Sequence, residues 1–230
     1  MAKRPVFIAL HDRVGVRESL IDFKWHSGFA VSQKQKSIQS LHREAMHHGY
    51  ENLLEISSKS ECDLGVALSA FNLKITTKKH KRTFTVESAF QGSKVFERGG
   101  PYVELFLQDS LSAKRDIRLK ESGNLVKFQF FGIDYPNEPR TFFYDWLYIN
   151  ALVQNSVLSE QVRSFDGFTD IEFNPEKSIN CQAHSVALYQ SLVANGVLEE
   201  ALKSPKDFLK LTREHYANQA RTVTVQDKMF

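Results

Sequence analysis

The segment Thr83-Phe-Thr-Val-Glu-Ser-Ala-Phe-Gln-Gly-Ser-Lys-Val-Phe-Glu97 changes its hydrophobic period in the middle. Up to Val86, apolar and polar residues alternate, which is typical of a β-strand. Beyond Val86 the apolar residues recur at helical spacing, and Glu87, Gln91 and Lys94 share a second helical face. A Gly-Gly-Pro sequence then predicts the end of the helix. The segment therefore predicts a strand that passes directly into a helix, with a carboxylate in the first helical turn.

The composition is that of an ordinary soluble globular protein. The chain has 230 residues, 42% of them hydrophobic and 25% charged, which is enough for one large domain with a real core. The net charge of +3 permits an anionic partner without requiring one. We see no signal peptide and no apolar run near the roughly 18 residues of a membrane span, so we expect a cytoplasmic protein without membrane contact. The two cysteines, Cys62 and Cys181, are far apart in the sequence, which fits free thiols in a reducing compartment, and a single disulfide between them is the alternative.

Hydrophobic patterns predict an α+β fold that is mostly helical, with a small sheet built from N-terminal strands and a hairpin. We expect one domain over residues 1–211 and a polar tail over 212–230. A long connection, residues 165–180, is rich in carboxylates and turn formers. The expected strands cover residues 5–10, 21–25, 52–57, 73–75 and 83–86, and residues 125–131 form a strand or a buried turn. A helix is expected over residues 34–48 with Ser32 as its N-cap, a second helix follows Val86 in the 83–97 segment, and a very apolar helix begins at Thr141. Further helices are expected over residues 63–70, 110–120, 181–195 and 198–211.

The common motifs of metal, nucleotide and serine-hydrolase sites are absent from the sequence. There is no H-E-x-x-H, C-x-x-C, Walker A, G-x-G-x-x-G or G-x-S-x-G pattern. The adjacent pair His47-His48 fits the C-terminus of a helix better than a metal site. We therefore expect neither a metal nor another cofactor.

Carboxylates are the main candidates for chemistry. Taken alone, Glu87 fits a first-turn residue that the helix dipole stabilises by about 0.3–1 kcal/mol. Paired with a carboxylate of the 165–180 connection, it could cleave a glycosidic bond, because one group assists the leaving group and the other activates water or stabilises positive charge. Asp166, Asp170 and Glu172 are available there, and they equally fit turns and helix caps.

Three further features of the sequence have both a functional and a purely structural interpretation. Trp146 could be a base-stacking platform or a core side chain on an apolar stripe. The basic loop 78–82, Lys-Lys-His-Lys-Arg, could hold a phosphate backbone or be a solvated hairpin tip. Lys177, Ser178 and Asn180 precede a helix whose N–H groups could receive a phosphate, although Ser178 or Asn180 could simply cap that helix.

Two motifs in the chain resemble the NADAR (YbiA-like) family. Residues 68–72, Leu-Ser-Ala-Phe-Asn, are similar to its serine–small–Phe segment, and residues 86–94 are similar to its E-x-x-F-Q-x-x-K helix start. More narrowly, the chain resembles the NADAR antitoxins encoded beside DarT-type DNA ADP-ribosyltransferase toxins. Residues 31–38, 54–60, 143–150 and 168–175 support this likeness, which spans about residues 3–210 and includes an N-terminal part, 1–60, specific to the subgroup.

The resemblance implies an N-glycosidase of a toxin–antitoxin and phage-defence system that removes ADP-ribose from guanine bases of DNA. The catalytic Glu of the family corresponds to Glu87, and its Asp to Asp166 or Asp170. The family's Trp does not align, and Trp146 is a residue of the right type a little further along. Residues 174–180 replace a glycine-rich family segment. Lys94 corresponds to the Lys of the family's helix motif, and the expected substrate-binding residues in the two motifs are Ser69, Phe71, Asn72, Gln91 and Lys94. Lys177, Ser178 and Asn180 are expected to bind substrate because, with Lys94, they would face the diphosphate.

The expected substrate is ADP-ribosylated DNA or ADP-ribosyl-guanosine, and the cognate DarT-type toxin is a further candidate partner. Two alternatives stay open. One is an N-glycosidase acting on a phosphorylated riboflavin-pathway intermediate, against which the basic loop argues weakly. The other is a non-enzymatic antitoxin that neutralises the toxin by binding it.

Overall fold

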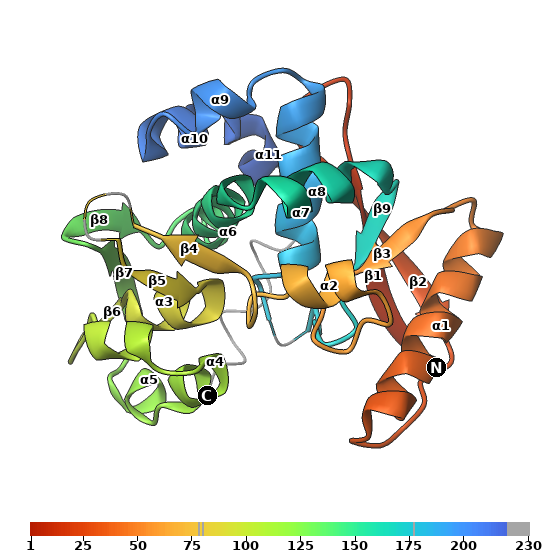
Figure 1. The fold of residues 1–230 in the computed structure, drawn as a ribbon, viewed down its shortest axis with the longest axis horizontal. Helices are drawn as coiled ribbons and strands as arrows, with labels where there is room; N and C mark the ends of the chain where they lie inside the picture. The colour runs from red at the N-terminus through yellow and green to blue at the C-terminus, as the bar shows by residue number, and fades with distance from the viewer. Residues whose placement is uncertain (78, 80, 177, 220–230) are drawn as a thin grey trace. The chain divides into compact units, whose positions relative to one another are not determined.

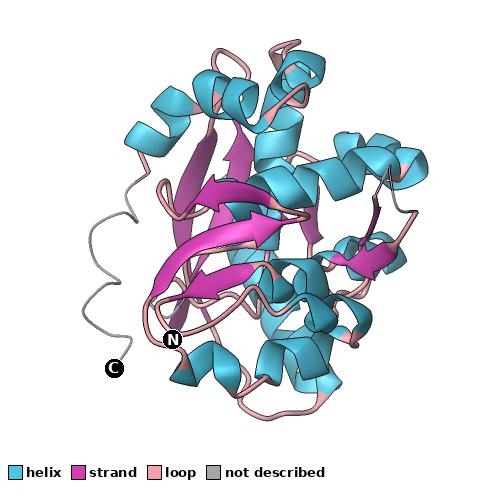
Figure 2. Cartoon of the chain, turned by 90° about the vertical axis from the view of Figure 1, so that its left-hand side faces the viewer, coloured by secondary structure: helices cyan, strands magenta, loops and turns pink. Residues whose placement is uncertain are grey.

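The computed structural model describes residues 1–77, 79, 81–176 and 178–219. The chain forms two compact units. The first unit comprises Met1–Ser69 and Val157–Phe230, and the second comprises Ala70–Ser156. Strands form small separate sheets and helices pack beside them (Figure 2), which confirms the α+β class. In the described part of the chain, no helix is both long and apolar enough to cross a membrane.

The first unit is built on a four-stranded sheet with the order β2-β1-β9-β3. β1 (Ala2–Ala9) pairs along its whole length with β2 (Val16–Phe23), antiparallel. On its other side β1 pairs with β9 (Gly167–Thr169), which runs parallel to β3 (Leu53–Glu55). The short strand β9 therefore ties the C-terminal part of the unit into its N-terminal sheet.

Helices cover both faces of this sheet (Figure 1). Ile38 and Leu41 of α1 (Val31–His47) pack in one apolar cluster with Val6, on one face of the sheet. Phe7, the next residue of β1, meets the ring of His184 edge-on at 5.7 Å, so its face carries α8 (Gln182–Ala194). The unit also contains α2 (Asp63–Leu68), the 3₁₀ helix η2 (Val162–Ser164), α9 (Leu198–Ala201), α10 (Pro205–Leu211), α11 (Arg213–Ala217), and α7 (Ser156–Gln161), which begins at the last residue of the second unit.

The second unit packs around the apolar helix α6 (Phe142–Gln154). The Phe143 ring stacks on Phe128 at 4.6 Å and on Phe90 at 6.2 Å, so α6, a strand and a helix share one aromatic core. The hairpin is β4 (Lys74–Thr76) with β5 (Thr83–Thr85), and a second sheet has the order β6 (Lys94–Phe96), β7 (Leu125–Phe130), β8 (Ile133–Pro136). The remaining helices are α3 (Val86–Gly92), the 3₁₀ helix η1 (Val103–Leu107), α4 (Ser110–Arg115) and α5 (Arg118–Glu121).

The predicted passage from strand to helix is confirmed, but the helix is shorter than predicted. β5 ends at Thr85 and α3 begins at Val86, yet α3 ends at Gly92 rather than near residue 99. A Cβ at Gly92 would lie 2.5 Å from the Phe106 ring, so glycine permits the close approach of η1 at this point. The next residues, Lys94–Phe96, pair with β7. Sheet pairing therefore overrides the helical pattern, and Lys94 lies on a strand.

Other boundaries also differ from the prediction. The helix predicted over 110–120 is α4 followed by α5, and the helix predicted over 198–211 breaks where Ser204 caps α10 ahead of Pro205. Ser32 is not the cap of α1, because Ala30 holds that position without a side-chain bond.

Cys62 and Cys181 are both free thiols. The single domain over 1–211 with a tail over 212–230 stays a prediction; α11 lies within that stretch, and 220–230 lie outside the described residues.

Candidate functional site

Glu87 is fixed by the junction of β5 and α3 in the second unit. The Thr85 hydroxyl caps α3 by accepting a 3.1 Å hydrogen bond from the Ser88 N–H. The Glu87 N–H donates to the Ala70 carbonyl at 2.9 Å, which ties the first turn to the segment before β4. Only 5% of Glu87 is exposed. A buried carboxylate in the first turn of a capped helix is held in one position by the backbone on both sides of it.

Two side chains bind the Glu87 carboxylate. Gln91 Nε2 donates to Glu87 Oε1 at 2.9 Å, and Lys114 Nζ lies 3.5 Å from the same oxygen. Lys114 comes from α4, is half-exposed, and lies 5.1 Å above the Phe71 ring. Gln91 Oε1 is buried and has no hydrogen-bond partner among the described residues. The site thus offers an anchored anion, a cation at its rim and an acceptor oxygen that a bound hydroxyl could occupy.

Lys94 completes this cluster from β6. Its Nζ lies 4.8 Å from the centre of the Phe90 ring. Burial lowers the pKa of Lys94 to about 8, Glu87 opposes that shift, and Lys114 adds to it. An anionic ligand would favour the charged ammonium, so Lys94 is suited to binding a diphosphate. The prediction that Lys94 lies on the same helical face as Glu87 is wrong, because Lys94 lies on β6. Its side chain nevertheless interacts electrostatically with the Glu87 carboxylate.

Trp146 lies on α6 and is half-buried beside the Tyr135 ring, with 5.2 Å between the ring centres. Its Nε1 is buried and has no acceptor among the described residues. Of the other residues predicted to bind substrate, Asn72 is exposed and Phe71 is half-buried in this unit, whereas Ser69 is the buried last residue of the first segment of the first unit.

Asp170 lies in the first unit, directly after β9, and is 6% exposed. Its Oδ1 accepts hydrogen bonds from the N–H groups of Glu172 and Phe173 at 3.0 and 3.1 Å. The Cys181 thiol lies 3.8 Å from its Oδ2. Burial raises the pKa of Asp170 well above its usual range, and the nearby carboxylates Glu55 and Glu172 add to the rise. Burial and the two nearby carboxylates thus both disfavour the charged form of Asp170.

Sequence reasoning missed Glu55 as a partner of Asp170. Glu55 ends β3, is buried, and accepts hydrogen bonds from Thr169 Oγ1 at 2.6 Å and from the Ile171 N–H at 2.8 Å. Burial also raises the pKa of Glu55. The same Thr169 hydroxyl lies 2.8 Å from His42 Nε2, and burial lowers the pKa of His42 to about 4, so this imidazole is neutral. The sequence signal for Glu55 was a carboxylate between the apolar residues Leu54 and Ile56 of an expected strand.

The remaining predicted residues of the first unit are less enclosed. Asp166 is exposed, and its backbone N–H donates to the Asn52 carbonyl at 3.2 Å. Ser178 is exposed, and Asn180 has a buried Oδ1 without a partner in the described part of the chain. Neither caps α8, because Cys181 holds the N-cap position without a side-chain bond. Lys177 lies outside the described residues.

The structure thus brings Glu87, Gln91 and Lys94 together in the second unit and adds Lys114, for which the sequence carried no signal. In the first unit Asp170 is buried close to Glu55, whereas Asp166 is exposed. That one of these aspartates completes the site of Glu87 stays a prediction. Among the described residues, no three His, Cys, Asp or Glu side chains are grouped as metal ligands.

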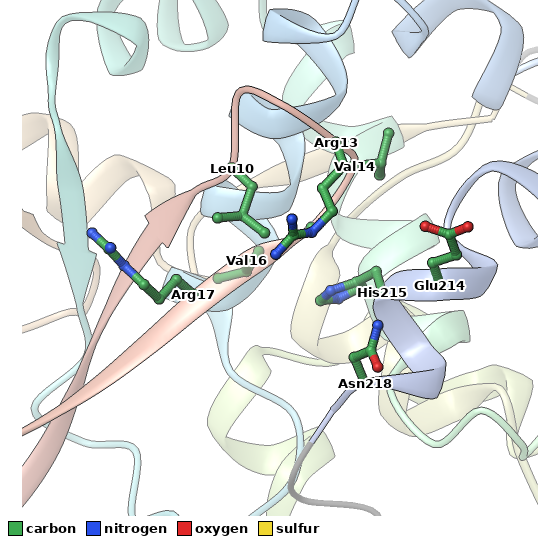
Figure 3. A pocket seen from close by; sticks show the side chains of 9 residues that line it. Leu10, Arg13, Val14, Val16, Arg17, Glu214, His215 and Asn218 are labelled. Atoms are coloured by element: carbon green, nitrogen blue, oxygen red, sulfur yellow. The ribbon is translucent and has the colours of Figure 1, made fainter.

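A cavity of about 440 Å³ lies elsewhere in the first unit, between the β1–β2 turn and α11. Arg13, His215, Glu214 and Asn218 line it, and the Arg17 side chain extends away from them (Figure 3). None of the predicted site residues that the structure describes lines this cavity. This cavity is therefore not the predicted catalytic site, despite its size.

Comparison with known proteins gives one family. The family model of the DarT1-associated NADAR antitoxin matches residues 2–222, nearly the whole chain. No curated protein matches the chain.

Proposed function

Because the chain belongs to the family of DarT1-associated NADAR antitoxins, we propose that it exerts its antitoxin role as a hydrolase. In this proposal it removes ADP-ribose from guanine bases of DNA and so reverses the action of a DarT-type toxin. The observation that carries the proposal is the buried Glu87 carboxylate, fixed by Gln91 and Lys114 in a cluster that also contains Lys94.

The reaction adds water across the N-glycosidic bond. The bond between the ribose C1 atom and guanine breaks, the water oxygen bonds to C1, and the water proton ends on guanine. Positive charge develops at C1 in the transition state, and a fixed carboxylate stabilises such charge. Glu87 is the proposed carboxylate, which orients the ribose hydroxyls or assists the attack of water. Lys94 supplies the positive charge that the diphosphate requires.

Asp170 is the proposed second carboxyl group. Burial raises its pKa well above its usual range, which is the direction of shift that a proton donor to a leaving base requires. Asp166 is exposed and lacks such an environment. The buried Nε1 of Trp146 remains a proposed donor to the substrate, because it has no acceptor among the described residues.

The test is a direct assay of ADP-ribose release. The protein is incubated with an oligonucleotide that carries ADP-ribosyl-guanine, and free ADP-ribose is measured by chromatography. We expect the wild type to be active, Glu87→Gln to lose at least about 100-fold in kcat, and Glu121→Gln to match the wild type. Glu121 is a suitable control because it is an exposed glutamate of the same unit. An inactive wild type, or a fully active Glu87→Ala, would contradict the assignment.

The two alternative functions give different results in the same experiments. A preference for a phosphorylated riboflavin-pathway intermediate, assayed side by side, would indicate a metabolic N-glycosidase. Rescue of toxin-expressing cells by Glu87→Ala, together with a stable complex of antitoxin and toxin, would indicate neutralisation by binding.

A further inference from the structure

The turn between β7 and β8 carries a bulky aromatic residue in an unfavourable backbone conformation. β7 ends at Phe130 and β8 begins at Ile133, and these two residues pair, so the turn has two residues. Phe131 has φ 50° and Gly132 has φ 78°, which is the pattern of a type I′ turn. Asn or Asp normally occupies the first position of this turn, because large side chains are strained at positive φ. A phenylalanine here needs an explanation outside the turn itself.

The Phe131 ring belongs to an aromatic stack that reaches the surface. It stacks on Phe84 at 5.8 Å and 27° and on Phe106 at 5.8 Å and 30°. Phe84 and Phe106 are buried, whereas 36% of Phe131 is exposed. The strained turn therefore holds an aromatic ring at the boundary between the core of the second unit and solvent.

A cavity of about 360 Å³ lies at this stack. Phe84, Phe106 and Phe131 line it together with the exposed Val103 and Leu107 of η1. Arg82 and Gln129 also line it, and the Gln129 amide nitrogen donates to Asp134 Oδ1 at 2.8 Å. The cavity is in the size range of small-molecule sites, and it combines flat apolar walls with a few polar groups.

The charges around the cavity favour an anionic occupant. Arg82 has no ion-pair partner among the described residues, and its loop also carries the exposed Lys79 and Lys81. Lys78 and His80 of the same loop lie outside the described residues. Glu104 also lines the cavity, and Arg118 binds both the Glu104 carboxylate at 2.5 Å and the Asp116 carboxylate at 2.8 Å, so these three residues together carry one net negative charge. Arg82, Lys79 and Lys81 outnumber that charge, so the net charge of the described residues around this surface is positive.

We infer that this surface, Phe131 with Arg82, Lys79 and Lys81, binds a single-stranded segment of DNA, with one base stacked on Phe131 and a phosphate on Arg82. Stacking on an aromatic ring beside a basic groove is the general mode by which proteins bind single strands. A duplex offers no free base face to Phe131. The inference rests on the proposed function for its biological setting, because an enzyme that acts on a modified base in DNA also binds the strand that carries this base, but its test does not require catalysis.

The test measures binding of an unmodified, fluorescently labelled single-stranded 12-mer by anisotropy, with a duplex of the same sequence for comparison. We expect Phe131→Leu to bind the single strand at least about fivefold more weakly and Phe131→Trp to bind it at least as well as the wild type. Both variants keep the backbone strain, so they isolate the ring. Ile133→Thr, an exposed residue of the same hairpin outside the cavity, is the matched control and should not change the affinity.

Arg82→Gln gives an independent readout. It should reduce the slope of log affinity against log salt concentration by about 0.7, the value for one phosphate contact on a single strand, whereas Phe131→Leu should leave the slope unchanged. Equal affinity for duplex and single strand, or Phe131→Leu within twofold of the wild type, overturns the inference. If Phe131→Leu instead weakens capture of the cognate toxin and spares DNA binding, the surface is a protein contact and the inference is wrong.

The two proposals fail separately. Loss of the inference alone appears as intact release of ADP-ribose from an oligonucleotide by Phe131→Leu, with unchanged kcat/KM. Loss of the proposed function alone appears as an inactive wild type that still binds single strands in a Phe131-dependent way. If both hold, Phe131→Leu lowers kcat/KM on the modified oligonucleotide but not on ADP-ribosyl-guanosine, which has no neighbouring base to stack.

Discussion

Gln91 Nε2 donates a 2.9 Å hydrogen bond to Glu87 Oε1, one helical turn earlier on α3. Both side chains are buried, so this bond orients the carboxylate in a place where water cannot easily replace it. The free Oε1 of Gln91 is left facing no partner within the described residues. Gln91 is thus a positioning residue for Glu87 and a candidate acceptor for a ribose hydroxyl.

Gln91→Leu should therefore lower kcat more than it lowers stability. The substitution removes the donor to Glu87 but keeps a side chain of similar bulk, and misplacement of a catalytic group costs roughly 10- to 100-fold in rate. The measurement is kcat and KM for ADP-ribose release, with a thermal melt to confirm folding. Gln91→Glu should shift the pH profile upward, because two adjacent carboxylates raise each other's pKa. Unchanged kcat in both variants would contradict this role.

Binding of ADP-ribose should weaken as the pH rises through about 8. The pKa of Lys94 is about 8, so its ammonium is charged below that pH and neutral above it, and only the charged form attracts the diphosphate. Calorimetric titration with ADP-ribose from pH 6.5 to 10 should show this inflection. Lys94→Arg should remove it, because arginine stays charged throughout.

Lys114→Gln supplies a second check on the same inflection. Lys114 lowers the pKa of Lys94 by like-charge repulsion, so its removal should move the inflection to higher pH. Lys120→Gln, which changes an exposed lysine outside the Glu87 cluster, is the control and should leave the inflection in place. An inflection that does not respond to Lys94 or Lys114 would assign the titration to another group.

Asp170→Asn should abolish release of ADP-ribose while raising thermal stability near pH 7. The folded-state pKa of Asp170 is raised, so its stability contribution is present at low pH and is lost as the pH rises above the unfolded value of about 3.9. Asparagine mimics the protonated form and avoids that loss. The gain in Tm should be largest near neutral pH and should shrink toward pH 4. About 2–4 °C is expected per kcal/mol in a chain of this size.

Asp166→Asn is the matched control for Asp170→Asn, since Asp166 is exposed and lies four residues earlier. It should change neither Tm nor activity. The opposite pattern, with activity lost in Asp166→Asn and retained in Asp170→Asn, would reverse the assignment of the second carboxyl group.

Glu55→Ala should destabilise the first unit by roughly 2–4 kcal/mol, measured by urea unfolding. The substitution leaves the buried Ile171 N–H without its acceptor, removes the Thr169 hydroxyl bond and empties buried space, and a buried donor without an acceptor alone costs about 1–3 kcal/mol. Glu51→Ala, at an exposed position near the start of β3, should stay within about 0.5 kcal/mol of the wild type. An equal effect of the two substitutions would show that Glu55 does not tie β3 to the segment after β9.

Local sequence patterns were sufficient to predict those helices and strands that depend mainly on interactions between residues near in sequence. The apolar stripes of α6 and α8 predicted both helices, and the alternation before Val86 predicted β5. The end of α3 was mispredicted because it depends on the approach of Phe106 and on the pairing of Lys94–Phe96 with β7. β9 was missed inside the 165–180 connection because three residues form a strand there only through pairing with Phe7 and Leu54.

The same distinction holds for the candidate site. Glu87 and Gln91 are four residues apart on one helix, so their contact follows from helical spacing. Lys114 reaches the same carboxylate from another helix, and Glu55 meets Thr169 and Ile171 across more than a hundred residues of sequence. No pattern in a single sequence encodes such contacts, because they depend on how distant elements pack.

No residue separates β5 from α3, so the strand that ends the basic loop and the helix that carries Glu87 form one continuous element. A substrate that binds the loop would therefore act on the same element that carries Glu87, the proposed catalytic carboxylate. Binding energy from remote nucleotides can then be spent on aligning the reaction rather than on tighter association. Lengthening the oligonucleotide should consequently raise kcat by a larger factor than it lowers KM. A flexible Gly-Gly insertion after Thr85 should remove this dependence of kcat on oligonucleotide length.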